Sequence, residues 1–260
     1  PCAHEKLADW LESDESDGVD NERVIQWLGA AHKALPQDED IAIALGRGLS
    51  RFGAHDVARS HLHAMVMAAP DSVSLQNQWF NLCFNAEDLA AIEDQAQRIE
   101  GSLPAQAAWY RARVAFKESR FADVGPLVEQ VVQHDPEAVS TRSLWADAAM
   151  ELKDFETARA QRKLVVQAQE SPERGARWGW LIAASAAENW AEVRAQAKAL
   201  EMELDEVPSD DHPVEEDWGV IYLRHDDDGY THDLLVQCTG AATARILQPS
   251  RRTHEQRLGD

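Results

Sequence analysis

Apolar side chains recur every three or four residues from about residue 20 to residue 204, which predicts a series of amphipathic helices. The pattern then changes. Residues 218–225 and 230–240 are rich in β-forming side chains and bracket an Asp228-Gly229 pair, the sequence of a tight hairpin turn. A third strand is expected at 242–248, and an acidic, proline-containing linker at 205–217 separates the two patterns.

The helical part repeats itself. In each of the segments 119–136, 153–172 and 188–204, an aromatic residue is followed three positions later by a small or branched apolar one. These pairs are Phe121 and Val124, Phe155 and Ala158, and Trp190 and Val193, spaced by 34 and then 35 residues. Segment 44–70 has the same skeleton, formed by Leu45, Gly46, Leu49, Ala58, Leu62, Met65 and Pro70.

This pattern resembles the tetratricopeptide repeat, a helical hairpin with a period of 34 residues. The resemblance covers about 200 residues, with a degenerate copy at 72–104 and an N-terminal copy for which 20–36 is the second helix. It implies a mostly α protein: an α-solenoid of about six hairpins over 1–204, the first and third degenerate. The linker at 205–217 and a small antiparallel β meander at 218–260 would follow.

The resemblance also implies a binding surface. Members of this family bind a segment of another protein in a concave groove lined by the first helix of each repeat. The residues expected in that groove form a mildly basic, aromatic stripe: Arg47, Arg51, Asn77, Asn81, Trp109, Arg113, Lys117 and Trp178. Such a stripe suits a peptide with a carboxylate, with Trp109 as an apolar anchor. The alternative is a helix face that is simply solvated.

Charge narrows the choice of partners. The formal net charge is −21, with eleven acids to three bases in residues 1–40 and thirteen to one in 201–233. This excess argues against nucleic-acid or anionic-membrane partners and favours basic ones, or it serves only solubility. The sequence has neither an apolar run of membrane-spanning length nor a signal-peptide pattern at its start, and Cys2, Cys83 and Cys238 fit reduced thiols. A cytoplasmic location is expected.

The C-terminal hairpin contains the one candidate metal site. If Asp228 and Gly229 form the loop, His225 lies opposite His232 and Arg224 opposite Asp233, with Asp227 nearby. Two imidazoles and a carboxylate are ligands that a zinc-like ion accepts. Aspartates are also what an exposed turn requires, so a plain hairpin is the preferred interpretation and the metal site stays an alternative.

Motifs of catalysis and nucleotide binding are absent from the sequence, including G-x-S-x-G, G-x-G-x-x-G after a strand, the Walker loop and H-E-x-x-H. The resemblance implies a scaffold or adaptor for a protein or peptide partner, without a cofactor, and an enzyme is the less favoured interpretation. Two alternatives remain open. One is a metal-dependent or catalytic activity in the β unit, and the other is an acidic, chaperone-like partner of a basic protein.

Overall fold

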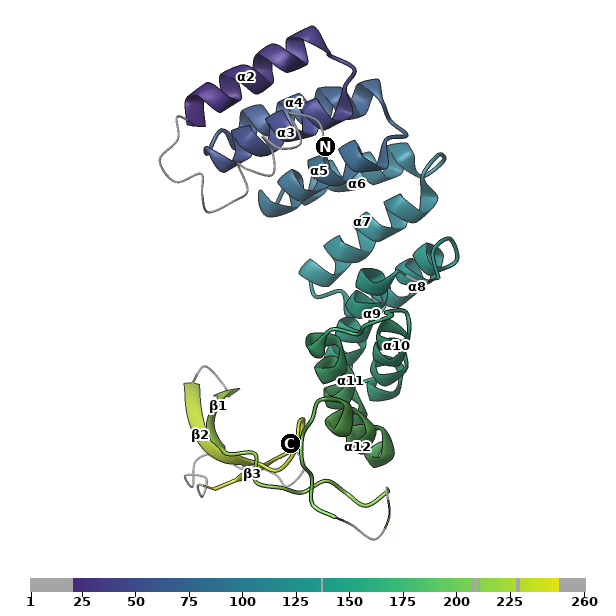
Figure 1. Ribbon diagram of the computed structural model, residues 1–260, viewed down its shortest axis with the longest axis vertical. Coiled ribbons are helices and arrows are strands. Elements are labelled where there is room, and N and C mark those ends of the chain that lie inside the picture. The colour runs from purple at the N-terminus through teal and green to yellow at the C-terminus, as the bar shows by residue number, and fades with distance from the viewer. Residues whose placement is uncertain (1–20, 137, 207–208, 210, 228–229, 248–260) are drawn as a thin grey trace. The chain divides into compact units, whose positions relative to one another are not determined.

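The computed structural model describes residues 21–247 except for 137, 207–208, 210 and 228–229 (Figure 1). Its helices are α2 (Asn21–Ala34), α3 (Glu39–Arg51), α4 (His55–Ala68), α5 (Val73–Asn85), α6 (Leu89–Ile99), α7 (Pro104–Lys117), α8 (Phe121–Val132), α9 (Val139–Glu151), α10 (Phe155–Gln167), α11 (Arg174–Ala186) and α12 (Trp190–Ala199). From α3 onward they form five consecutive hairpins within this range, which confirms the predicted repeats. The sequence also predicts a short amphipathic helix at about 4–12 before the 20–36 helix, and this segment lies outside the described residues.

Polar side chains define where many of these helices begin. At five helix N-termini a side-chain oxygen accepts a hydrogen bond from the backbone N–H three residues further on. The capping residues are Asp38, Ser72, Asp88, Asp154 and Asn189. Each satisfies an N–H group that has no partner within the helix, so the sequence fixes these starts locally.

The turn inside each hairpin has one backbone conformation. Five turn residues, one per hairpin, lie in the left-handed region with φ between 54° and 80°: Gly53, Glu87, Ser119, Lys153 and Glu188. The N–H of the residue after each of them donates to the carbonyl five positions earlier, at 2.8–2.9 Å. This is the Schellman closure of a helix, which glycine adopts most easily. The repeat is therefore visible in the backbone even where the glycine is missing.

Replacing one of these residues by glycine should stabilise the protein. Lys153 has φ 59°, and a side chain in this region costs about 1–2 kcal/mol, partly offset by the greater freedom of glycine in the unfolded chain. Lys153→Gly is expected to raise the free energy of unfolding by about 0.5–1 kcal/mol, measured from urea titrations followed by circular dichroism. The reverse change, Gly53→Lys at the matching turn, should lower it. A loss of stability in Lys153→Gly would contradict this account.

Most hairpins are also joined by a polar contact between residues 19 positions apart. Gln95 donates to Gln76 at 3.1 Å, Arg142 to Gln161 at 3.0 Å, and Arg177 to Gln196 at 3.3 Å. In the first hairpin a ring nitrogen of His61 lies 3.1 Å from the carbonyl oxygen of Ala42. These groups are buried or half-buried, so leaving one without its partner would be costly. Each contact fixes one helix of a hairpin against the other.

The described chain divides into two compact units. The first holds α2 to α7 and the end of α8 from Pro126, and the second holds the start of α8, α9 to α12 and the strands. In the first unit, helices α3 and α4 approach closely at Gly46. A Cβ atom added to Gly46 would lie 2.8 Å from Cγ of the buried Leu62 on α4. The small residue at this position of the repeat is thus required by the packing, as the sequence pattern implies.

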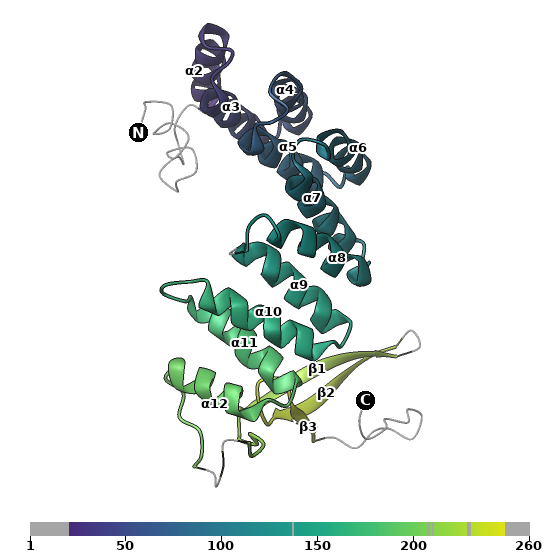
Figure 2. The same cartoon turned by 90° about the vertical axis from the view of Figure 1, so that its right-hand side faces the viewer.

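The second unit contains the predicted meander. Its strands are β1 (Val220–Asp227), β2 (Tyr230–Cys238) and β3 (Ala244–Ile246), in the order β1-β2-β3 (Figure 2). Pairing is antiparallel, with Arg224 opposite Asp233 and His225 opposite His232, which confirms the predicted register. The strands follow from the β-forming side chains of the sequence and from the Asp-Gly pair that separates them.

The segment before β1 packs against the last hairpin. Val214 is buried in a cluster with Leu181 of α11 and Val193 of α12, and Trp218 is half-buried against that cluster. The Arg194 side chain of α12 donates to the carbonyl of His212 at 2.9 Å. Apolar contacts therefore hold part of the acidic stretch 205–217 on the helices. The division of the chain into domains at residues 204 and 217 stays a prediction.

Candidate functional site

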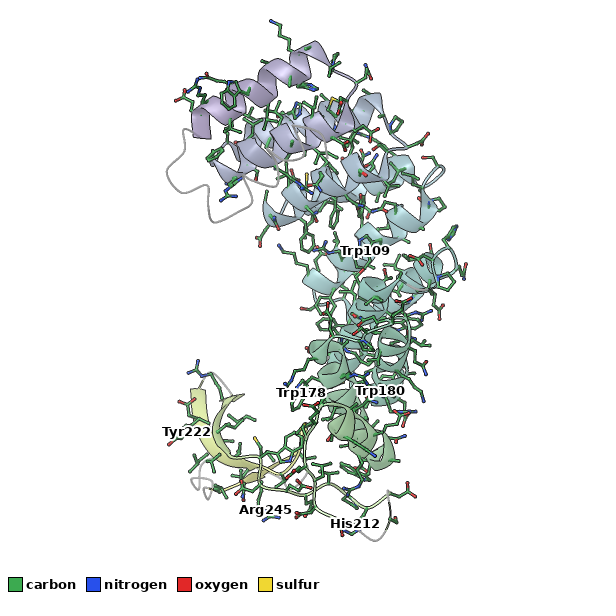
Figure 3. The ribbon with its side chains drawn as sticks, viewed as in Figure 1. Trp109, Trp178, Trp180, His212, Tyr222 and Arg245 are labelled. Atoms are coloured by element: carbon green, nitrogen blue, oxygen red, sulfur yellow. The ribbon has the colours of Figure 1, made fainter. Side chains whose placement is uncertain are left out.

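Seven of the eight residues predicted to line a groove lie on the first helices of three successive hairpins in the first unit. These helices are neighbours, because α5 contacts both α3 and α7. The seven residues are Arg47, Arg51, Asn77, Asn81, Trp109, Arg113 and Lys117. We refer to the surface they form as the α3–α5–α7 face. Figure 3 labels Trp109, which is half-buried on α7.

The centre of this face is the guanidinium group of Arg113. Its Cζ atom lies 4.4 Å from the ring centroid of Phe84, 5.0 Å from that of Phe80 and 5.8 Å from that of Trp109. Electron-rich ring faces attract a cation, so three aromatic rings position this one. Its Nη1 donates a long hydrogen bond of 3.5 Å to Oδ1 of Asn81. The result is a half-buried positive charge held at a defined place.

Arg113 differs from Arg111 and Arg59 in having no acidic partner among the described residues. Burial lowers the pKa of its guanidinium, and no acidic side chain among the described residues offsets that effect. Arg111, two positions earlier on the same helix, pairs with Glu93 at 2.9 Å and with Glu100 at 3.0 Å. Arg59 likewise pairs with Asp56 and Asp88. A cation in a partly desolvated place is stabilised by a carboxylate, and here a ligand could supply one.

The polar residues around Arg113 are already tied to neighbouring helices. Lys117 lies 4.8 Å from the ring centroid of Phe84, donates to the carbonyl of Phe84 at 3.2 Å and pairs with Glu87 at 3.1 Å. Asn77 accepts hydrogen bonds from Gln106 at 2.6 Å and from Tyr110 at 3.2 Å. These contacts fix the side chains between α5 and α7 before any ligand arrives.

At the α3 end of the face, Arg47 and Arg51 are both exposed. The Nε of Arg47 donates to Oε1 of Gln78 at 3.1 Å, which links α3 to α5. The face therefore has one half-buried arginine on α7 and exposed cations on α3 and at the end of α7.

The eighth predicted residue, Trp178, belongs to the second unit. Its ring lies edge-to-face with that of Trp218, with centroids 6.1 Å apart. Figure 3 labels Trp178 on α11. The two rings pack with the apolar cluster of α11 and α12. A role for Trp178 in the same surface as Trp109 stays a prediction.

The candidate metal ligands lie at the tip of the β hairpin. The backbone places His225 opposite His232 and Asp227 opposite Tyr230, while their side chains are outside what the structure describes. Among the side chains that are described, no group of three or more histidine, cysteine, aspartate or glutamate residues could hold a metal ion. The metal site at His225, His232 and Asp227 is therefore still only a sequence hypothesis, and the enzymatic alternative gains no further support.

Three aromatic residues that pack beneath Arg113 and its neighbours were not predicted from the sequence. Phe80, Phe84 and Tyr110 had no assigned role, yet Phe80 stacks on Tyr110 with ring centroids 4.3 Å apart, and two of the three hold Arg113. A signal was present in their spacing. Contacts between successive first helices join residues 29 to 33 positions apart, as in Asn77 with Tyr110 and Phe84 with Arg113.

Comparison with solved structures identifies the helical architecture. PilW, described as a widely conserved type IV pilus biogenesis factor, matches with a TM-score of 0.56 and 16% identity over 76% of this chain and 90% of its own. PilF from Pseudomonas aeruginosa gives 0.55 and 12% over 77% and 93%. A tetratricopeptide repeat protein from Parabacteroides merdae gives 0.51 and 11% over 77% and 78%. The chain has the tetratricopeptide fold.

In sequence, no family model and no curated protein matches the chain. The tetratricopeptide fold thus rests on structure and on the repeat pattern together. It is a helical repeat scaffold, in which consecutive helical hairpins stack on one another. Within the part of the chain that the structure describes, no helix is long and apolar enough to cross a membrane. The cytoplasmic location and the exclusion of nucleic acid stay predictions.

Proposed function

We propose that the α3–α5–α7 face binds a short segment of another protein through a carboxylate of that segment. The observation that supports this most strongly is the half-buried guanidinium of Arg113, held by three aromatic rings and without an acidic partner among the described residues. A carboxylate that pairs with it would form charge-assisted hydrogen bonds in a place partly shielded from water. The protein would then serve as a scaffold or adaptor.

The net charge restricts the partner further. At −21 the whole chain repels an acidic protein over distances up to about 10 Å at 0.1 M salt, whereas Arg113 acts only at contact distance. A partner that is neutral or basic overall, with one acidic side chain or a free C-terminus in the bound segment, satisfies both conditions. Basic residues outside that segment would speed its approach.

The neighbouring residues fit the rest of such a segment. Trp109 is half-buried beside Arg113, and the exposed part of its ring can cover one apolar side chain of the ligand. Asn81 is exposed on α5 and its amide can bond to the backbone of an extended chain. The sequence also left two alternatives open, a catalytic β unit and an acidic chaperone-like protein. No specific observation among the described residues favours either.

The proposal can be tested with an array of 12-residue peptides that vary in apolar and acidic content, each made with a free and an amidated C-terminus. Peptides with a carboxylate next to an apolar residue should bind, and fluorescence anisotropy gives their Kd. Arg113→Ala should raise that Kd about tenfold, the loss of one charge-assisted pair. Added NaCl should weaken binding to the wild type.

Arg111→Ala is the matched control, because it removes the same charge from α7 at a residue paired with Glu93 and Glu100. It should leave the Kd of the peptides unchanged, once circular dichroism has shown that both variants are folded. Equal binding to Arg113→Ala and the wild type, or selection of peptides without any carboxylate, would show that the proposed function is wrong.

A further inference from the structure

Strand β1 exposes an apolar sequence at the edge of the sheet. Four consecutive residues are open to solvent, with Val220 at 54%, Ile221 at 48%, Tyr222 at 69% and Leu223 at 44% of their full accessibility. In the described strand order, β2 covers one side of β1 and no strand covers the other. Figure 3 labels Tyr222 on this hairpin. Proteins usually protect such edges with charges, prolines or bulges, because an open apolar edge pairs with other strands.

The hydrogen bonds show which backbone groups of β1 point outward. Leu247 donates to the carbonyl of Leu235, so residue 235 of β2 bonds toward β3. Since bonding alternates along a strand, Leu234 and Val236 bond toward β1, in agreement with the bond from Cys238 to Gly219. The partners of these two residues are Leu223 and Ile221.

It follows that the even-numbered residues of β1 direct their backbone N–H and C=O groups away from β2. These residues are Val220, Tyr222, Arg224 and Asp226. The first three present three donors and three acceptors along the open edge, beside the exposed apolar side chains.

We propose that β1 pairs antiparallel with β1 of a second copy of this chain, with the two Tyr222 residues opposite each other. In this register the outward groups meet: Tyr222 bonds to Tyr222 of the other copy, and Val220 to Arg224. The side chains match as well, because Ile221 lies opposite Leu223 and the stem of Arg224 lies along Val220. The two three-stranded sheets become one sheet of six strands.

Other registers are less favourable. If one β1 strand shifts by one residue against the other, the even-numbered residues of one copy lie opposite odd-numbered residues of the other. The backbone groups of those odd-numbered residues already bond to β2, so the hydrogen bonds between the two copies are lost. A shift by two residues places Leu223 opposite Gly219 in one direction, or Val220 opposite Asp226 in the other. The sequence of β1 is therefore self-complementary about Tyr222, which a strand selected for a different partner need not be. The contact is short, so a weak dimer with a Kd in the micromolar range is expected.

Sedimentation equilibrium of the whole chain across a wide range of concentrations tests this dimer. Tyr222→Pro removes one outward N–H from each copy, at an edge position where proline does not disturb the pairing with β2. It should raise the Kd of the dimer about tenfold or more. Tyr222→Lys keeps the N–H but places two like charges opposite each other, and it should weaken the dimer similarly if the proline variant does not fold.

Leu247→Lys is the control, since Leu247 is 45% exposed just after β3, at the opposite edge. It should leave the Kd unchanged. Higher salt should strengthen the dimer, because both copies carry a charge of −21 and an apolar contact forms against that repulsion. A chain that stays monomeric at every concentration overturns the proposal. So does a dimer that withstands both Tyr222 variants, that is lost in Leu247→Lys, or that dissociates as salt rises.

Discussion

Gly46→Val is expected to lower the free energy of unfolding by about 3 kcal/mol, near the upper end for overpacked cores. The Cβ atom alone would lie 2.8–3.0 Å from three side-chain carbons of Leu62, closer than such atoms approach. Both residues are buried, so neither helix can move aside without opening the core of the first unit. Because Arg47 and Arg51 follow on the same helix, part of the α3–α5–α7 face would shift as well.

Gly29→Val is the matched control. Gly29 also lies within a helix, α2, but an added Cβ would meet no atom within 4 Å. The two substitutions carry the same change in helix propensity, which is below about 0.5 kcal/mol. Urea unfolding followed by circular dichroism measures both. Equal stabilities of the two variants would show that the close approach of α3 and α4 is not needed for packing.

Glu192→Ala should cost about 3 kcal/mol in the second unit, because it leaves several polar groups without their acceptor. The carboxylate of Glu192 is only 18% exposed. It accepts hydrogen bonds from Trp180 at 2.8 Å and from Arg159 and Lys163 at 3.0 Å each. These donors lie on α10 and α11, so one side chain of α12 ties three helices together. The fluorescence of the tryptophans can follow unfolding alongside circular dichroism.

The difference in stability between the wild type and Glu192→Ala should depend on pH. Burial tends to raise the pKa of Glu192, but the bonds from Trp180, Lys163 and Arg159 outweigh it and hold the pKa below its ordinary value. A carboxyl whose pKa is lowered on folding stabilises the protein above its unfolded pKa of about 4.3, and that stability is lost as pH falls through the folded pKa. The difference between wild type and Glu192→Ala should therefore shrink in acid.

Glu156→Ala controls for charge. Glu156 also pairs with Arg159, at 2.7 Å, but its side chain is 67% exposed. Such an exposed pair contributes about 0–1 kcal/mol, and this variant should stay close to the wild type at every pH. A Glu192→Ala protein as stable as Glu156→Ala would mean that the three donors find water or other acceptors.

The repeat and the hairpin register could be predicted because both depend on short-range patterns. The spacing of Phe121, Phe155 and Trp190 sets the period of the helices. The Asp-Gly pair and the β-forming side chains on either side of it predict the pairing of Arg224 with Asp233. In each case a few neighbouring residues decide the local conformation, and the rest of the chain only has to be compatible with it.

The environment of Arg113 could not be predicted in the same way. The sequence places Arg113 on the expected face but does not show that Phe80 and Phe84, on another helix, lie beneath it while acids pair with Arg111 instead. That outcome depends on the rotation of α7 against α5. The packing of Val214 on the last hairpin was equally hidden, because its acidic surroundings indicate an exposed linker.

The polar contacts within the hairpins have a consequence for where the array can be interrupted. Each joins the residue 11 positions before the left-handed turn residue to the one 8 positions after it. In the α7–α8 hairpin those positions hold Ala108 and Leu127, whose side chains cannot bond. The boundary between the two compact units runs through this same hairpin. The boundary therefore interrupts none of these four contacts, and each unit keeps the polar contacts of its own hairpins complete.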